Sequence, residues 1–410
     1  MKLRVILAAL ALAVSGVPVA ANDDRAAWHP VDAETGRIAE IDGLEALAAS
    51  FPDSGSVRLR LFNAQLGAEQ GEAALASLRW LADRGYVFSE AARGQIPELI
   101  GAAFAERAKA LLLPPAQPIV TSEIVATVPK EAGLVESVVV PGSDGIFAAT
   151  SVSERTVWFF TEDGEQLAME IPGAGNLSGI VSDDKRNVGW VASGNIDGSE
   201  DGERFFAGLI GITNDPDQFL RVAAPVGVNL SDLHIADDGT VYASDPLGGG
   251  IYRMKAGSST LETLIAPGTF RSPQGLASSA DGGRLYVSDY RYGIALVDLD
   301  TGLVTRLASD VPAILDGVDG LWRHGDRLIA VQNGTSPMRI SAFRLSDDGL
   351  RVVEAEVLER KNPEWTEPLS GSIREDALYY VGNGQWGRFE AGKPVDGKPA
   401  VPTQIRRLKL

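Results

Sequence analysis

Six polar residues recur along the chain at positions where oxygen ligands for a hard cation could gather. Each stands nine to twelve residues ahead of a bulky residue in a repeated strand pattern. These six residues are Glu136, Ser178, Ser231, Gln274, Asp319 and Ser370. Two carboxylates, one amide and three hydroxyls would suit calcium, which takes about six to eight oxygen ligands. The residue types alone leave two interpretations open: a divalent-metal site, or polar side chains that only solvate a channel.

Four further polar residues come directly after the bulky positions. They are Asp245, Asp289, Asn333 and Asn383. If each pattern is a pair of antiparallel strands, the second strand returns to the face where the first began, so both polar sets would meet at one end of the molecule.

The elements that would position these residues are repeated units of β-structure. The bulky positions are Phe147, Trp190, Tyr242, Tyr286, Ile329 and Tyr379, and the intervals between them are 43, 52, 44, 43 and 50 residues. A period of about 40 to 50 residues with about four short strands is typical of a propeller blade. We therefore predict a mainly β fold, a six-bladed β-propeller over residues 119–410. Residues 119–128 would pair with 403–409 to close the ring and hide both sheet edges.

A helical section precedes the propeller, within residues 22–118. Residues 56–67 and 72–84 have leucines at helical spacing and predict two antiparallel helices that resemble a single tetratricopeptide-like hairpin. A stack of such repeats needs about three copies for stability, and no complete second copy is present. The section is therefore either a brace packed on the propeller or an arm that binds a protein partner. The Pro-rich segment 113–118 ends the last helix and forms the linker.

The first 21 residues have the pattern of a cleavable secretory signal peptide. Lys2 and Arg4 precede a short apolar run, and small residues end at Ala21, the expected cleavage site. The run is too short to span a bilayer, which needs about 20 apolar residues, and no later segment is long enough. We expect a periplasmic or secreted protein without a membrane span.

Composition excludes several classes of function. The formal net charge is −18, which argues against nucleic acid and anionic membranes as partners. The chain has no cysteine, so disulfides, thiolate metal sites and cysteine nucleophiles are excluded, and its three histidines leave little material for histidine catalysis.

Three segments resemble the gluconolactonase and regucalcin family of six-bladed propellers. They are NLSDLHIADDGTVYASD, SPQGLASSADGGRLYVSD and GVDGLWRHGDRLIAV, and the resemblance covers about residues 119–410. In that family a divalent metal is held by Glu, Asn and Asp of the first, fourth and fifth blades, which implies Glu136, Gln274 and Asp319 here. The third-blade Asn that contacts substrate corresponds to Ser231, and an Arg often found two residues earlier corresponds to Asn229.

The resemblance implies a divalent-metal-dependent hydrolase of lactones or related esters. Calcium is the expected cofactor, and Asp319 would be both a ligand and the general base. Gln274, Ser231 and Asn229 depart from the family pattern. The alternative is therefore a non-catalytic propeller that binds a ligand or a protein, with a smaller place for carbon–nitrogen bond chemistry as in strictosidine-synthase-like propellers.

Other residues would complete a small-molecule site at the channel mouth. We include Ser370 and Trp386 in the substrate-binding set with Ser231 and Asn229. Trp386 belongs to the long connection 382–402, which either covers a ligand or is an ordinary exposed loop. Arg271 and Arg291 fall near the same end and would be able to pair with an acidic ligand, although surface arginines are usually solvated. His234 and His324 are interpreted as structural residues, with a paraoxonase-like histidine base as the alternative.

Overall fold

A computed structural model describes residues 27–31, 34–142, 145–199, 204–215 and 218–410. The expected signal peptide, residues 1–21, lies outside the described residues. Within the described part, no helix is both long and apolar enough to cross a membrane.

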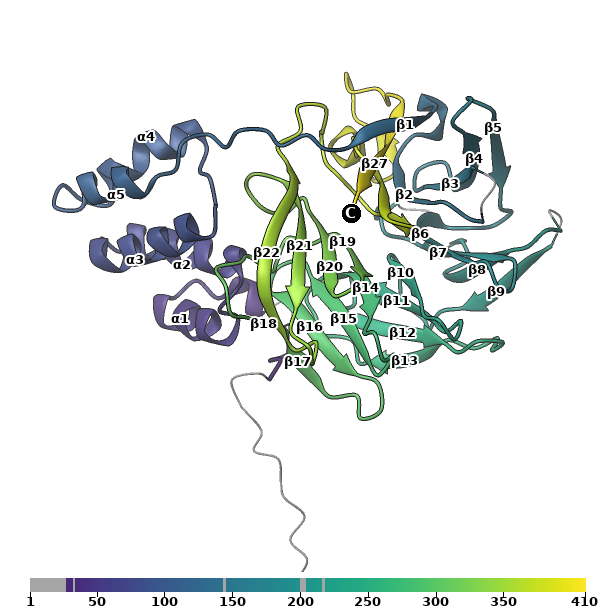
Figure 1. Ribbon diagram of the computed structural model, residues 1–410, viewed down its shortest axis with the longest axis horizontal. Coiled ribbons are helices and arrows are strands. Elements are labelled where there is room, and N and C mark those ends of the chain that lie inside the picture. Colours follow the sequence, from purple (N-terminus) through teal and green to yellow (C-terminus); the bar gives the residue numbers. More distant parts are fainter. Residues whose placement is uncertain (1–26, 32–33, 143–144, 200–203, 216–217) are drawn as a thin grey trace, which may run out of the picture.

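The described chain begins with a group of helices on one flank of the molecule (Figure 1). They are η1 (Thr35–Arg37), α1 (Ile41–Ser50), α2 (Gly55–Gly67), α3 (Gly71–Asp83), α4 (Glu90–Leu99) and α5 (Ala105–Leu111). Helices α2 and α3 match the two predicted helices to within one residue at each end. Ser54 caps α2 and Ser89 caps α4, because each hydroxyl accepts a hydrogen bond from a backbone N–H three residues later. The tetratricopeptide likeness stays a prediction.

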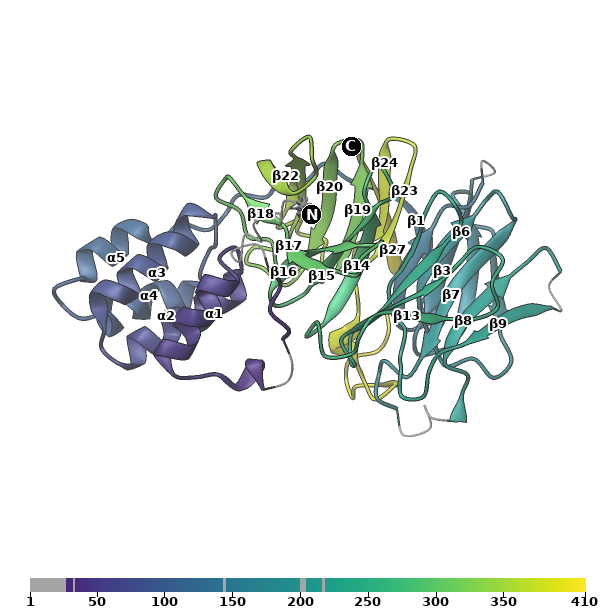
Figure 2. The ribbon, with the colours of Figure 1, turned by 90° about the horizontal axis from the view of Figure 1, so that it is seen from below.

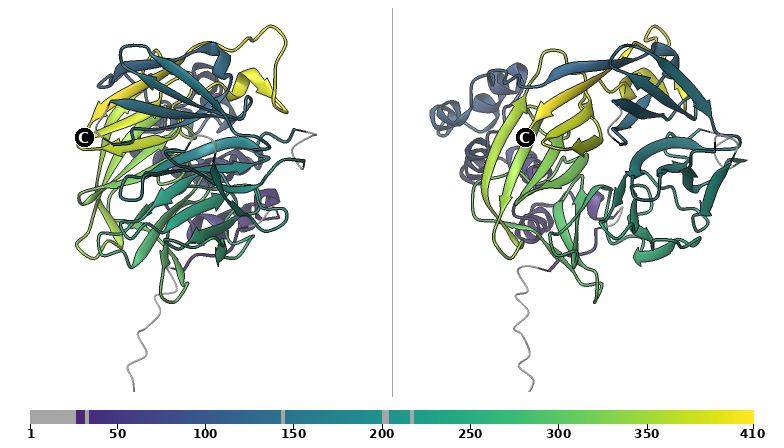
Figure 3. Two further views of the ribbon diagram at one scale, coloured as in Figure 1. Left: turned by 90° about the vertical axis from the view of Figure 1, so that its right-hand side faces the viewer. Right: turned by 45° about the vertical axis from the view of Figure 1, so that its right-hand side comes forward.

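The rest of the chain is a six-bladed β-propeller, as predicted from the repeat (Figures 1 and 3). The strands of blades one to three are β2 (Val135–Val139), β3 (Ile146–Ser151), β4 (Thr156–Thr161) and β5 (Gln166–Glu170); β6 (Asn176–Asp183), β7 (Val188–Gly194), β8 (Gly208–Ile212) and β9 (Phe219–Ala223); and β10 (Leu233–Ile235), β11 (Val241–Asp245), β12 (Gly250–Met254) and β13 (Glu262–Ile265). Each blade buries apolar side chains against its neighbours, so the core is a set of clusters between blades.

Blades four to six follow the same plan with two additions. Their strands are β14 (Pro273–Ser278), β15 (Arg284–Asp289), β16 (Gly293–Asp298) and β17 (Val304–Arg306); β19 (Gly320–His324), β20 (Arg327–Gln332), β21 (Arg339–Leu345) and β22 (Arg351–Arg360); and β23 (Gly371–Arg374), β24 (Ala377–Val381), β27 (Thr403–Lys409) and β1 (Glu123–Val128). Strand β18 (Ala308–Ser309) adds to β22, and β25 (Phe389–Glu390) pairs with β26 (Lys393–Pro394). Short helical turns η2 (Lys130–Ala132) and η4 (Trp386–Arg388) lie in connections.

The ring closes where the sequence predicts. Strand β1, which precedes the first blade, pairs antiparallel with β27 at the end of the chain, with Val128 opposite Thr403. The last blade is thus built from both ends of the propeller segment, and β27 is covered by β1 on one side and β24 on the other.

The helical section packs directly on blades four and five (Figure 2). Phe51, at the end of α1, contacts Trp28 and Tyr292 with ring centroids 5.0 and 4.9 Å apart. The buried carboxylate of Asp316, in the loop before β19, accepts hydrogen bonds from the backbone N–H of Gly55 at 2.7 Å and Ser56 at 2.8 Å. The first turn of α2 is therefore held by the propeller, as expected of a brace.

Candidate functional site

A cavity of about 450 Å³ lies at the end of the central channel where the innermost strands begin. Four of the predicted residues line it together: Glu136, Ser231, Gln274 and Asp319. We call it the mouth cavity. Asn333, Trp386, Arg271 and Arg291, all discussed from the sequence, also line it.

Backbone contact between blades four and five places Gln274 beside Asp319. The N–H of Gly275 donates to the carbonyl oxygen of Asp319 at 2.9 Å. A Cβ atom on Gly275 would lie 2.3 Å from the backbone nitrogen of Leu321, so a glycine is required for this approach. The amide of Gln274 and the carboxylate of Asp319 thus start from adjoining backbone.

Four acidic residues influence one another at the mouth cavity. Burial, followed by repulsion from Asp232, raises the pKa of Glu136 to about 8. Burial also raises the pKa of Asp232 to about 7, against a hydrogen bond from Ser370 that lowers it. The pKa of Asp319 is raised well above its usual value by burial and then by the charges of Glu136, Asp232 and Glu367. The cavity therefore concentrates negative charge at a cost in free energy.

One carboxylate oxygen in this group has no partner in the part of the chain that the structure describes. Asp319 is only 9% exposed, and its Oδ2 atom is buried without a hydrogen-bond partner among the described residues. Gln274 uses its amide nitrogen to donate to Ser272 Oγ at 3.2 Å, and no hydrogen bond to its amide oxygen occurs in the described part of the chain. Buried polar atoms are normally paired, so Asp319 Oδ2 is a candidate to hold a ligand, and the half-buried Gln274 offers a second free oxygen.

Two neighbours orient the acidic side chains. Trp386, in η4, donates from its indole nitrogen to Glu136 Oε2 at 2.7 Å. Asn333 accepts from the hydroxyl of Tyr290 at 2.8 Å and donates to the carbonyl oxygen of Pro368 at 3.1 Å, and its amide lowers the pKa of Asp319. The connection carrying Trp386 is also fixed by Gln385, which donates to Val401 O and Thr403 Oγ1.

Several predicted residues are not brought into the mouth cavity. Asn229 uses its amide oxygen to accept from the backbone of Asn195 at 2.7 Å. Ser178 donates to the carbonyl oxygen of Ser231 at 3.1 Å, and Ser370 is buried as the partner of Asp232. The polar atoms of these three side chains already form hydrogen bonds with backbone groups or with the Asp232 carboxylate. They therefore support the walls of the site.

The polar residues after the second strands divide in the same way. Asn333 reaches the cavity, whereas Asp245, Asp289 and Asn383 bond to backbone groups of nearby turns. Side chains at the strand ends are needed there to satisfy turn N–H groups.

Asp232 and Glu367 were not singled out from the sequence. Asp232 immediately follows Ser231, and Glu367 stands three residues before Ser370. Glu367 lines the mouth cavity, and Asp232 lies close enough to raise the pKa of Glu136 and Asp319. The blade spacing assigns one residue to each blade and therefore passes over such neighbours. The available signal was a carboxylate within three residues of Ser231 and of Ser370.

The residues present fit a hard divalent cation. Carboxylate and amide oxygens are its preferred ligands, and the unpaired oxygens of Asp319 and Gln274 lie beside mutually repelling carboxylates. Within the described chain, no three His, Asp or Glu side chains form a ready-made metal-ligand group. A cation here would accordingly depend on an amide oxygen such as that of Gln274.

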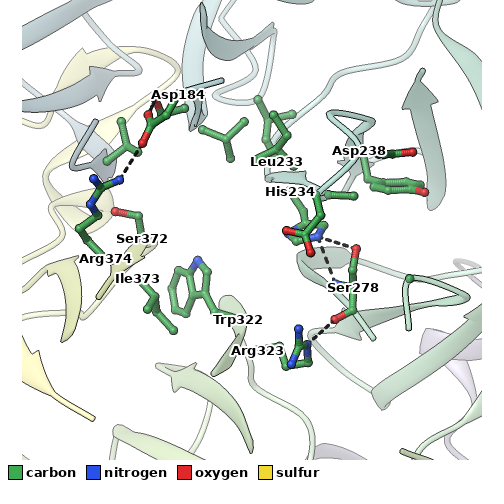
Figure 4. A pocket seen from close by; sticks show the side chains of 18 of the residues that line it. Asp184, Leu233, His234, Asp238, Ser278, Trp322, Arg323, Ser372, Ile373 and Arg374 are labelled. Carbon is green, nitrogen blue, oxygen red and sulfur yellow. Dashed lines mark hydrogen bonds and ion pairs between the residues drawn. The ribbon is translucent and has the colours of Figure 1, made fainter. Parts of the chain in front are cut away.

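The other end of the channel holds a larger cavity of about 600 Å³ (Figure 4). Its polar groups satisfy one another: Asp184 pairs with Arg374 at 2.7 Å, and His234 Nε2 lies 2.7 Å from Ser278 Oγ and accepts from the Ser278 N–H at 3.1 Å. Burial lowers the pKa of His234 to about 4, so this ring is neutral at pH 7. Such a histidine fits the structural interpretation, and we place the candidate site at the mouth cavity.

The chain matches no protein-family model and no curated protein. Among solved structures, it is similar to a gluconolactonase from Xanthomonas campestris, with 15% identity, a TM-score of 0.48 and coverage of 73% of this chain and 99% of the other. It is also similar to the calcium-binding protein regucalcin from Agrobacterium tumefaciens, with 16% identity, a TM-score of 0.46 and coverage of 70% of this chain and 95% of the other. A third similar structure is virginiamycin B lyase from Staphylococcus aureus, with 13% identity, a TM-score of 0.47 and coverage of 72% of this chain and 100% of the other. Gluconolactonase and regucalcin proteins thus stand among its structural neighbours, as the sequence resemblance predicted, and the likeness concerns the fold alone.

Proposed function

We propose that the protein is a divalent-metal-dependent hydrolase of lactones or related esters, acting at the mouth cavity. The observation that carries the proposal is the buried Asp319 Oδ2, which has no partner in the described chain and is surrounded by the charges of Glu136, Asp232 and Glu367. Several carboxylates buried together destabilise a protein unless protons or a cation compensate them. Calcium is the first candidate because all the available donors are oxygens.

Glu136, Gln274 and Asp319 would hold the cation. When bound, such a cation supplies a Lewis acid that polarises a carbonyl oxygen and acidifies water. Asp319 acts as the general base that takes a proton from the attacking water. The water oxygen then forms a bond to the carbonyl carbon, the ring C–O bond breaks, and the proton ends on the released hydroxyl group.

A non-catalytic ligand-binding propeller is the second candidate. It is favoured by the lack of a ready-made group of three acidic or histidine ligands in the described residues. In this case the mouth cavity would bind a small molecule or protein without turnover.

Export and a protein partner of the helical section belong to the same proposal. Fractionation of cells that express the full chain would test export, with a periplasmic or extracellular product shortened at Ala21 as the expected result. Binding of a protein to α3 and α5, which lie on the outer flank of the helical section in Figure 1, would support the partner.

Calorimetric titration with calcium, manganese and zinc tests the metal site. We expect stoichiometric binding by the mature protein, loss of binding in Asp319→Asn, and unchanged binding in Asp300→Asn, which alters an exposed aspartate. A lactone and ester panel assayed with and without chelator then tests turnover. No binding of any of the three metals contradicts the metal site, and metal binding without turnover favours the second candidate.

A further inference from the structure

Two arginines stand at the boundary between the mouth cavity and a second cavity. Arg271 and Arg291 line the mouth cavity, and both also line a groove of about 420 Å³ between the propeller and α2. Residues of α2 form the opposite wall of this groove, among them Val57 and Arg60. A molecule bound at Asp319 and extending toward the helical section would pass these two guanidinium groups.

One buried carboxylate fixes the backbone that carries these two exposed arginines. Asp289, fully buried, accepts from the backbone N–H of Arg271 at 2.6 Å and from that of Arg291 at 3.0 Å. The carbonyl oxygen of Arg291 also accepts from the Ser54 hydroxyl at 2.8 Å. Both side chains therefore start from a fixed backbone, which lowers the entropy lost when they bind a ligand together.

Within the described chain, neither guanidinium group has an acidic partner. Among the described residues, neither Arg271 nor Arg291 forms a side-chain hydrogen bond or an ion pair, although the protein carries 55 acidic residues. Arg291 lies over the ring of Tyr290 at 5.4 Å from the centroid. By contrast, Arg60 in the same groove donates to three backbone carbonyl groups, so its role in the structure is evident.

Groups of both charges line the mouth cavity, and the two arginines lie where it meets the groove. The carboxylates of Glu136, Asp319 and Glu367 would repel an anion, while the two arginines would bind one through charge-assisted hydrogen bonds. A ligand that suits both sets of groups has an uncharged end and an anionic end.

We propose that the ligand of the mouth cavity carries an oxyanion, a carboxylate or a phosphate, which Arg271 and Arg291 bind at the boundary with the groove. Its uncharged end lies toward Asp319. The substrate class is accordingly an anionic lactone or ester. This inference rests on the proposed function only in naming a lactone or ester as the uncharged end of the ligand. The arginines would select an anionic ligand even without any turnover.

Binding of matched probe pairs tests the inference without an assay of hydrolysis. The phosphate pair is 6-phosphogluconate and gluconate, and the carboxylate pair is monomethyl glutarate and dimethyl glutarate. Calorimetry would be done on the mature protein with the cation that it binds, or without metal if it binds none. The variants are Arg271→Gln, Arg291→Gln and the double substitution. Arg79→Gln, which removes an exposed charge on α3, is the matched control.

We expect the wild type and the control to prefer the more anionic member of at least one pair by roughly tenfold or more. The pair that shows this preference identifies phosphate or carboxylate as the group. Each single variant should reduce the preference, and the double variant should abolish it while its melting temperature is unchanged. If turnover is found, KM for the anionic substrate rises and kcat is retained.

Two results would overturn the inference: a wild type that shows no preference in either pair or binds no probe, and a double variant with the wild-type preference. Failure of the proposed function looks different. A protein that keeps an arginine-dependent preference but neither binds metal nor hydrolyses any lactone refutes the hydrolase and leaves the anion site intact. A protein that hydrolyses neutral lactones, and whose activity neither arginine substitution changes, supports the hydrolase and refutes the anion site.

Discussion

The indole nitrogen of Trp386 donates a hydrogen bond of 2.7 Å to Oε2 of Glu136, joining residues 250 positions apart. Glu136 begins the first complete blade, and Trp386 lies in the last connection of the sixth. The bond therefore spans the closure of the ring at the mouth cavity, and it favours the charged form of the carboxylate.

Trp386→Phe should weaken cation binding in a pH-dependent way. Without the indole N–H, the pKa of Glu136 rises further above about 8, so protons compete better with the cation at neutral pH. We expect roughly tenfold weaker binding near pH 7 and a smaller difference near pH 9, measured by calorimetry. Trp365→Phe is the control, because Trp365 donates to Tyr380 away from the cavity. Equal affinities of the two variants at every pH would contradict this role of Trp386.

The metal-free protein should lose stability as the pH rises. The pKa of Glu136 is about 8 against an ordinary 4.5, and that of Asp232 is about 7 against 3.8. The folded state thus binds more protons than the unfolded state between these values, and stability falls from about pH 4 to pH 8. Melting temperatures measured with chelator should show this fall.

Two comparisons sharpen this measurement. Glu136→Gln should flatten the dependence and melt higher than the wild type near pH 8, because it removes one of the repelling charges. Added cation should restore the wild type there and have little effect on the variant. A metal-free melting temperature that increases steadily from pH 5 to 8 would refute the effect of these carboxylates.

Sequence spacing located Glu136, Gln274 and Asp319 because strand periodicity fixes where an innermost strand begins. Spacing does not distinguish Asp232 from Ser231, since the directions of their side chains depend on the loop that enters β10, a strand of only three residues. Asn229 is directed to the backbone of Asn195 by such a local contact. The two helices and the six blades were predicted from patterns repeated over many residues. A small local change in the backbone leaves such a pattern intact, although it changes the direction of a single side chain.

Asp232 should matter more than Ser231 for the chemistry of the mouth. Asp232→Asn removes a charge that raises the pKa of Glu136 and Asp319, whereas Ser231→Ala removes only a hydroxyl. We expect Asp232→Asn to weaken cation binding by roughly tenfold or more, through loss of negative potential, and Ser231→Ala to change it less than about threefold. Calorimetry and the chelator-sensitive assay would measure both. A larger effect from Ser231→Ala would show that direct contact outweighs charge.

Ser370→Ala separates positioning from charge at the same place. The Ser370 hydroxyl lowers the pKa of Asp232, so its loss should raise that pKa above about 7 and shift the pH at which cation binding reaches half its maximum upward. The affinity well above that pH should approach the wild-type value. A uniform loss at all pH values would indicate that Ser370 has only a packing role.

Asp316 should control how firmly the helical section is attached. Its buried carboxylate accepts from Gly55 N, Ser56 N and the Ser54 hydroxyl, which together satisfy the first turn of α2. Asp316→Ala leaves the N–H groups of Gly55 and Ser56 without this acceptor and removes a negative charge from a helix N-terminus, while the Ser54 hydroxyl keeps the carbonyl oxygen of Arg291. We expect a loss of about 2 to 4 kcal/mol in the free energy of unfolding, measured with urea.

A matched variant distinguishes this docking contact from any lost ion pair. Asp310→Ala removes an exposed carboxylate that pairs with Arg351, and exposed pairs contribute less than about 1 kcal/mol. Because Phe51 packs on Tyr292 beside the same junction, weakening Asp316 should also expose the chain around residues 51–55 to proteases before the blades unfold. If Asp316→Ala were no less stable than Asp310→Ala and no more sensitive to proteases, the aromatic contacts alone would hold the helical section on the propeller.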